Sequence, residues 1–115
     1  MFLMDEDDIK FILMGLKWMT MRGVREDGVY FKLNSKQYLK LNLFGDWFVR
    51  VQITNREFVN LDEMDDDDFM GVGYSKEDYL SHPYNTSNPS PMRVKYEFEI
   101  VEINENKIRE LFNGF

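Results

Sequence analysis

The chain has 115 residues, which is the size of one ordinary domain and too short for two separate cores. Hydrophobic residues make up 43% of it and aromatic residues 16%, far more than a disordered segment carries, so we expect a folded protein. The absence of cysteine excludes disulfides and thiolate metal sites and fits a reducing compartment. Because the start lacks a basic stretch and the next apolar run is too short to span a bilayer, we predict a cytoplasmic protein without a membrane partner.

The net charge of −7 is concentrated in one segment. Residues 61–90 alone carry −7, whereas residues 28–60 carry +3 and the two ends are weakly acidic. A concentrated negative field repels nucleic acid and anionic membranes and attracts basic partners. This asymmetry is the main functional signal in the sequence.

Residues 5–22 predict an N-terminal helix, with Asp5 or Asp8 as the N-cap and Gly23 just past its end. The helix would carry more apolar residues than one face can hold, so we expect it to be covered on two sides. The sheet would be one cover. A partner chain is a candidate for the other, which is compatible with a homodimer through this helix.

Three runs with period two then predict strands at residues 28–33, 38–44 and 47–54. The short polar and glycine-containing links between them are typical of turns, so we expect an antiparallel meander.

Residues 61–91 predict a long acidic loop that contains proline and glycine, with one short helical stretch capped by Ser75 and Asp78. Residues 92–103 then predict a long half-buried strand, and a short C-terminal helix follows, with Gly114 just past its end. The predicted fold is a single α+β domain over residues 1–115, with an antiparallel sheet of about four strands backed by the N-terminal helix.

The acidic stretch within the loop is the first candidate site. Closely packed carboxylates repel one another and are stabilised when a partner supplies lysine or arginine, and neighbouring rings can add apolar contacts. The surface could also imitate the charges of DNA. The predicted partner-binding residues are Asp62, Glu63, Asp65, Asp66, Asp67, Asp68, Phe69 and Tyr74.

A calcium loop is an alternative interpretation of the same stretch. Asp66, Asp68 and Glu77 occupy positions 1, 3 and 12 of an EF-hand loop. Met70 stands where an oxygen ligand belongs, which weakens the match. A merely solvated acidic loop is the third interpretation.

The predicted sheet offers a second alternative, a face that binds single-stranded nucleic acid. Rings and cations would project together from it, a combination suited to stacking on bases and pairing with phosphates. Its residues would be Tyr30, Lys32, Tyr38, Lys40, Phe48 and Arg50. The adjacent −7 segment argues against this function because it would repel phosphate.

The inventory of catalytic residues is small. His82 is the only histidine, and Ser81 beside it is not placed to act as a nucleophile paired with that base. No glycine-rich phosphate loop is present. We therefore predict neither enzymatic activity nor a cofactor.

In composition, this short acidic chain without an enzyme motif resembles phage accessory proteins and bacterial immunity proteins. The resemblance implies a protein of the bacterial cytoplasm. We predict a small binding module that inhibits or regulates a basic partner, such as a nuclease, a restriction or CRISPR effector, or a DNA-binding protein.

Overall fold

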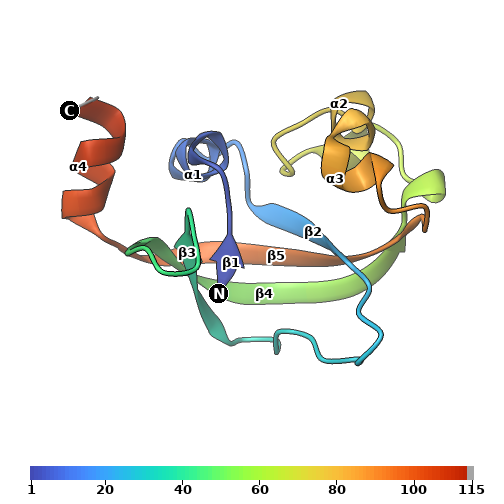
Figure 1. The fold of residues 1–115 in the computed structure, drawn as a ribbon, viewed down its shortest axis with the longest axis horizontal. Helices are drawn as coiled ribbons and strands as arrows, with labels where there is room; N and C mark the ends of the chain where they lie inside the picture. The colour runs from blue at the N-terminus through green and yellow to red at the C-terminus, as the bar shows by residue number, and fades with distance from the viewer. Residues whose placement is uncertain (114–115) are drawn as a thin grey trace.

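The two longest strands, β4 (Trp47–Asn60) and β5 (Met92–Ile103), form the centre of the sheet (Figure 1). The computed structural model describes residues 1–113. The antiparallel pairing runs from Val49 opposite Ile103 to Asn60 opposite Met92. The strands predicted in these two regions are confirmed, because alternating burial makes this signal strong, although β4 continues beyond the predicted end.

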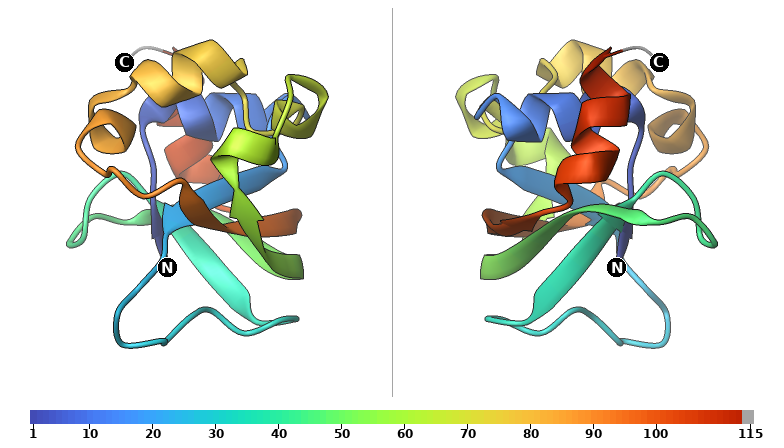
Figure 2. Two further views of the ribbon diagram at one scale, coloured as in Figure 1. Left: turned by 90° about the vertical axis from the view of Figure 1, so that its right-hand side faces the viewer. Right: turned by 90° about the vertical axis from the view of Figure 1, so that its left-hand side faces the viewer.

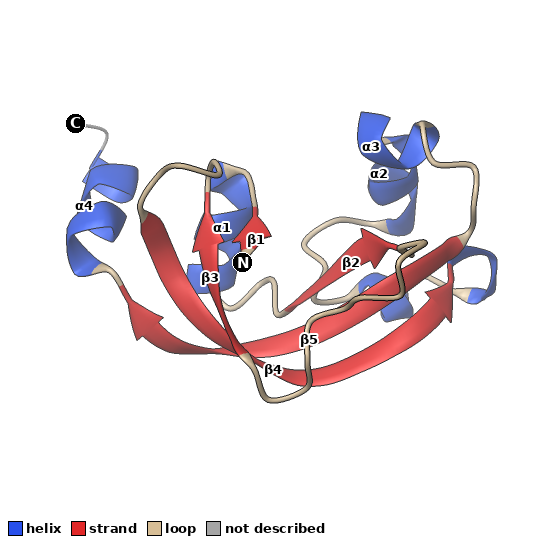
Figure 3. Ribbon diagram, turned by 60° about the horizontal axis from the view of Figure 1, so that its bottom comes forward, coloured by secondary structure: helices blue, strands red, loops and turns tan. Residues whose placement is uncertain are grey.

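Three short strands complete a sheet in the order β1-β3-β4-β5-β2. They are β1 (Phe2–Leu3), β2 (Met19–Gly23) and β3 (Lys36–Lys40). The pair β1–β3 is parallel and the others are antiparallel, so the predicted purely antiparallel sheet of about four strands is wrong in that detail. The α+β class holds: the sheet is curled, and the helices lie along one of its faces (Figures 1 and 3).

The predicted helix over residues 5–22 is wrong in its second half. Helix α1 spans only Glu6–Leu13, and the chain then turns at Gly15, whose φ is +77°. Residues 19–23 form β2 instead, paired with β5. This pairing accounts for part of the excess of apolar residues, because Met19 and Met21 are buried as strand residues, whereas Leu16 and Trp18 remain 56% and 41% exposed.

The predicted strand at residues 28–33 is also wrong. These residues form a loop that crosses below the sheet in Figure 1, bounded by positive φ angles at Gly28 and Asn34. Its rings still pack: Tyr30 and Phe31 lie against the main core, which explains why the segment alternates like a strand.

The segment 61–91 is more ordered than the predicted loop. It contains two short 3₁₀ turns, η1 (Leu61–Glu63) and η2 (Asp67–Phe69), and two helices, α2 (Lys76–Ser81) and α3 (Pro83–Thr86). The predicted cap is confirmed, since Ser75 Oγ accepts a hydrogen bond from Asp78 N at 3.2 Å. Helix α4 (Glu105–Asn113) confirms the C-terminal helix, while Gly114 lies outside the described residues.

Two clusters of buried side chains hold these elements together. The main core lies between the sheet, α1 and α4. Figure 2 shows segment 61–91 on the same side of the sheet as α1. A second cluster joins this segment to β2; its members are Met19, Met21, Leu61, Met64, Phe69, Val72 and Tyr79. No helix within residues 1–113 has the length and apolar character needed to cross a bilayer.

Gly71 is the point where segment 61–91 meets the start of β2, and alanine there should be poorly tolerated. Its φ is +93°, and a Cβ would lie 2.4 Å from Trp18 Cε2. We expect Gly71→Ala to lower the free energy of unfolding by about 3 kcal/mol, from backbone strain and overpacking together. Urea unfolding measures this.

Gly28→Ala is the matched control. Gly28 also has a positive φ, of +67°, but a Cβ there would meet no atom within 4 Å. Gly28→Ala should therefore lower the free energy of unfolding by only about 1 kcal/mol, the cost of the backbone conformation. Equal losses at the two positions would contradict the role assigned to the Trp18 contact.

Candidate functional site

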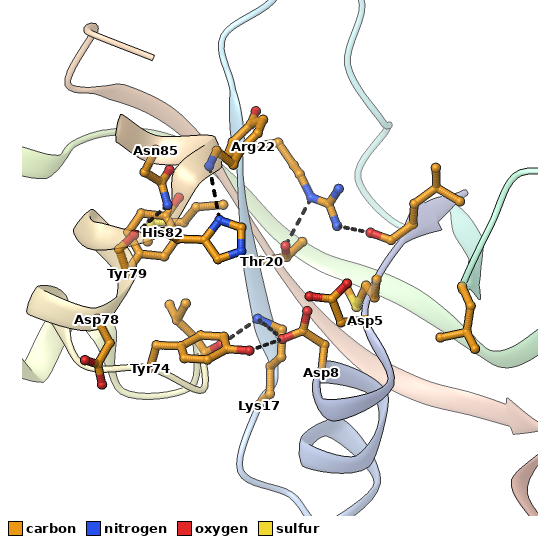
Figure 4. Close-up of a pocket in the computed structure, with 16 residues that line it drawn as sticks. Asp5, Asp8, Lys17, Thr20, Arg22, Tyr74, Asp78, Tyr79, His82 and Asn85 are labelled. Carbon is orange, nitrogen blue, oxygen red and sulfur yellow. Dashed lines mark hydrogen bonds and ion pairs between the residues drawn. The ribbon is translucent and has the colours of Figure 1, made fainter. Parts of the chain in front are cut away.

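A pocket of about 370 Å³ lies between the start of α1, strand β2 and the segment that carries α2 and α3 (Figure 4). Leu3, Met4, Met21, Leu41 and Val72 provide apolar lining. The polar and aromatic lining residues are Asp5, Asp8, Lys17, Thr20, Arg22, Tyr74, Asp78, Tyr79, His82, Tyr84 and Asn85. A concave site with an apolar base and several converging polar groups is the usual form of a small-molecule site.

Lys17 lies at one side of this pocket with only 5% of its side chain exposed. Its Nζ donates a hydrogen bond to the Val72 carbonyl and lies 4.0 Å from Asp8 Oδ1. Burial lowers the Lys17 pKa to about 8, an effect that the nearby Asp8 charge only partly offsets. A substantial fraction of Lys17 is therefore neutral just above neutral pH.

Asp8 also accepts a hydrogen bond from Tyr74. The Tyr74 hydroxyl lies 3.2 Å from Asp8 Oδ1, so Asp8, Lys17 and Tyr74 point toward one another (Figure 4). Burial, followed by the Asp8 charge, raises the Tyr74 pKa to about 12. Tyr74 therefore remains a hydrogen-bond donor at physiological pH.

Arg22 extends from β2 into the same pocket. Its Nε donates to Thr20 Oγ1 at 3.1 Å and its Nη2 donates to the Leu3 carbonyl at 3.1 Å. The guanidinium carbon lies 5.1 Å from the centre of the Phe2 ring, and burial lowers the Arg22 pKa. Within the described residues Nη1 makes no hydrogen bond, which leaves a donor for a ligand.

The opposite wall comes from α2 and α3 and is rich in rings. His82 Nδ1 accepts a hydrogen bond from Tyr84 N at 3.2 Å, so Nε2 carries the proton of the neutral ring. The Tyr84 hydroxyl accepts from Gly23 N at 3.1 Å, which fixes α3 against β2. The buried Tyr79 hydroxyl has no hydrogen-bond partner among the described residues.

Two further carboxylates line the pocket without an ion-pair partner among residues 1–113. Asp5 stands at the N-cap of α1, but its side chain makes no capping hydrogen bond. Asp78 lies in the first turn of α2, where the backbone cap comes from Ser75 instead. Both carboxylates can therefore accept hydrogen bonds from a bound molecule.

The structure keeps the six predicted carboxylates together but separates them from the predicted rings. All six are exposed: Asp62 and Glu63 lie on turn η1, Asp67 and Asp68 on turn η2, and Asp65 and Asp66 between the two turns. Phe69 is only 1% exposed in the second cluster, so its ring is not available as a surface contact. Tyr74 belongs to the pocket wall.

The residues of the calcium alternative make local hydrogen bonds. Asp65 and Asp68 each accept from the other's backbone N–H, and Asp66 Oδ1 lies 3.4 Å from Lys76 N. Within residues 1–113, no group of three or more histidine, cysteine or acidic side chains is arranged to hold a metal ion. The predicted set with Glu77 is therefore not brought together.

The predicted nucleic-acid face is brought together only in part. Arg50 lies over the Tyr38 ring, 5.5 Å from its centre, and also 3.7 Å from Glu102. Phe48 points into the main core, and Tyr30 packs on Phe58 from the crossing loop. The predicted rings and cations therefore do not form one continuous face.

Sequence reasoning missed the pocket altogether. Lys17 and Arg22 lie within the predicted helix, and His82 receives no catalytic role in the sequence prediction. The available signal was the pair of basic residues within the apolar stretch 16–22, an unusual position for long cations. Their convergence with residues 74–85 depends on contacts between distant segments.

Comparisons with known proteins establish the fold alone. No family model matches the chain, and a search of curated proteins finds no significant match. The crystal structure of protein EF3133 from Enterococcus faecalis V583, described as a DUF984 family model, is similar with a TM-score of 0.69 at 15% identity. The match covers 86% of this chain and 70% of that one, and its description names no activity.

Lys17 should make stability depend on pH between about 7.5 and 9.5. Its pKa is about 8 in the folded protein and near 10.5 when unfolded, so the unfolded chain holds more protons in this range. The free energy of unfolding should therefore rise by about 1 to 2 kcal/mol as pH increases. Urea unfolding at several pH values measures the slope.

Lys17→Met should remove this slope above about pH 8.5 whatever its effect on absolute stability. Below that pH a smaller slope should remain, because burial also lowers the pKa of the Met1 amino group from its usual value of 8.0. Lys107→Met is the matched control, because Lys107 lies on α4 far from the pocket with much greater exposure. A slope above pH 8.5 that survives in Lys17→Met, or that disappears in Lys107→Met, would contradict the assignment. Measurements stop below pH 10, where tyrosines begin to titrate in the unfolded chain.

Proposed function

We propose that this protein binds a small, planar, uncharged molecule whose edge carries both hydrogen-bond donors and acceptors, as a nucleobase does. The observation that carries the proposal is the convergence of free donors, free acceptors and rings on one pocket of about 370 Å³. That volume lies within the usual range for small-molecule sites.

The free polar groups support a ligand with a mixed edge. Arg22 Nη1 and His82 Nε2 are available to donate, while Asp5 and Asp78 are available to accept. A ligand that offered only acceptors would leave the carboxylates without partners and bring negative charges close to them. A planar ring with adjacent N–H and C=O groups satisfies both kinds of protein group.

The charges in the pocket favour an uncharged ligand. Three carboxylates and two cations line it, and Lys17 is already paired with Asp8 and the Val72 carbonyl. A phosphate or a carboxylate would therefore meet more negative than positive charge. The rings of Tyr79, His82 and Tyr84 instead suit stacking on a planar molecule.

Lys17 also gives the pocket a means of moving protons. A lysine whose pKa is near 8 is able to accept a proton from a bound molecule and return it. The absence of enzymatic activity stays a prediction from sequence. Lys17 is the residue that would carry acid–base chemistry if a bound ligand were found to react.

Asp5→Asn is the sharpest test of ligand binding. Calorimetric titration with adenine, cytosine, guanine and uracil should find at least one base that binds the parent protein. Asp5→Asn should weaken that binding about tenfold or more, because a charged hydrogen-bond acceptor is replaced by a neutral one.

Asp7→Asn is the matched control. Asp7 stands in the first turn of α1, two residues after the N-cap Asp5, and does not line the pocket. The change therefore removes a charge from the same helix terminus and should leave binding unchanged. Failure of all four bases to bind, or an equal loss in both variants, would contradict the proposal.

As a second function we propose that the acidic segment docks a basic partner, as a module that inhibits or regulates a nuclease, an effector or a DNA-binding protein. What supports it is that six exposed carboxylates are held by buried neighbours: Leu61, Met64 and Phe69 secure turns η1 and η2 to the second cluster. None of these carboxylates takes part in an ion pair with any residue in 1–113. A fixed array of unpaired charge favours electrostatic docking over a mobile solvated loop.

Replacing Asp65 to Asp68 by asparagine should separate docking from folding. Asparagine retains the side-chain oxygens that accept backbone hydrogen bonds, so the free energy of unfolding should stay equal or rise by up to about 1 kcal/mol. Recovery of a basic partner by affinity capture from the native host should fall, most strongly at low salt.

The matched control removes four carboxylates elsewhere, at Glu26, Asp46, Glu105 and Glu110. It has the same net charge as the first variant but keeps the acidic segment. Equal capture by the two variants would show that only total charge matters and would contradict docking by this segment.

A further inference from the structure

One edge of the second half of β4 has no neighbouring strand among residues 1–113. Strand β3 pairs with β4 only as far as Lys36 opposite Gln52. On the other side, β5 continues its pairing to Asn60. Residues 54–60 therefore form an outer border of the sheet, which is visible along β4 in Figure 3.

The loop before β3 covers this edge only at its beginning. Asn34 N donates to the Ile53 carbonyl at 2.8 Å, and Ile53 N donates to the Ser35 carbonyl at 3.0 Å. Beyond Ile53, the loop contacts this part of β4 through side chains: Arg56 donates a hydrogen bond to the Phe31 carbonyl, and the Tyr30 ring packs edge-on against Phe58. Seven residues of extended backbone, about 23 Å long, remain open.

Open edges are normally blocked in proteins because they pair with other chains. A register shift between Ile53 and Asn55 marks the start of this one; residues 54–58 are exposed, and Val59 and Asn60 are half-buried. Phe58 shows 57% of its surface there and packs only edge-on with Tyr30. The border thus combines unpaired backbone groups with an accessible ring.

The charge at the far end of the border identifies the kind of chain that fits it. Next to the border, a groove of about 260 Å³ lies over the end of the β4–β5 pair; Glu57, Glu63 and Asp68 line it, and Lys95 of β5 is its one cation among the described residues. Lys95 is already paired with Glu57 at 2.5 Å and lies 3.7 Å from Glu97. Glu63 and Asp68 therefore remain free to attract lysine or arginine.

We propose that residues 54–60 of β4 accept an extended basic peptide segment as an added strand, with its cations over the groove formed by Glu57, Glu63 and Asp68. This inference rests on the second proposed function and specifies its partner as an extended segment. Backbone hydrogen bonds supply affinity, and the alternating side chains supply selectivity.

The test uses the full chain and a fluorescent peptide of alternating lysine and valine. Two further versions of this peptide are N-methylated at alternate residues. In one version the methyl groups lie on one edge of the extended peptide, and in the other version they lie on the opposite edge. Each version therefore loses the backbone donors of one edge and keeps all charges. We expect methylation of one edge to weaken binding tenfold or more and methylation of the other to have little effect. Amide resonances of residues 54–60 should shift on binding.

Protein variants establish the contribution of charge. Changing Glu63 and Asp68 to their amides should weaken binding severalfold, whereas the same change at Asp46 and Glu110 should not, because these lie near Lys107 on α4. Both doubly changed proteins have the same net charge.

Equal binding of the two methylated peptides would overturn strand addition while leaving docking by charge intact. No binding by the unmethylated peptide, or shifts confined to the pocket, would also overturn it. So would a stable dimer of the free protein joined through residues 54–60, because the edge would then be occupied by a second copy of the chain.

Discussion

The Gly71 carbonyl joins segment 61–91 to the start of β2. It accepts hydrogen bonds from both Trp18 N, at 2.8 Å, and Met19 N, at 3.1 Å, where the chain leaves α1 and enters β2. The next carbonyl, that of Val72, accepts from Lys17 Nζ. Because segment 61–91 is otherwise held mainly by side-chain packing, these backbone contacts fix its position relative to the sheet. The pocket exists because that position leaves a space between β2 and the α2–α3 segment.

The same contacts explain why a lysine is buried at this point. Lys17 must pass beneath the segment it holds, and its ammonium group loses most of its water in exchange for one carbonyl and a carboxylate 4.0 Å away. Such a charge is costly to bury, which is why its pKa falls to about 8. A replacement of similar volume without charge would fill the space at lower cost. Retaining lysine here is consistent with a role for its charge, or its proton, in the pocket.

The sequence predicted those parts of the fold whose pattern is local and strong. Strands β4 and β5 were predictable because Val49, Val51 and Ile53 alternate with polar residues over a long stretch, as do Val94, Tyr96 and Phe98. The helix prediction failed for residues 14–23 because Leu16, Trp18 and Met19 fit a helix equally well. Only the pairing with β5 favours a strand there. The acidic segment was predictable as exposed charge, but the burial of Phe69 within it was not. The pocket was not predictable because its walls come from segments far apart in the chain.

Segment 61–91 contributes residues to both candidate sites, the pocket on one of its sides and the acidic surface on the other. Its outer turns present carboxylates to solvent, while Tyr74, Tyr79 and His82 face the pocket. Between them lie Leu61, Met64 and Phe69, packed with β2 in the second cluster. A well-packed layer resists small displacements, so occupancy of the pocket would alter the acidic surface only by shifting this layer as a unit. The Gly71 contacts oppose such a shift, because it would break two backbone hydrogen bonds in a buried region. Ligand binding and docking are therefore expected to be energetically independent, despite sharing one short segment of the chain.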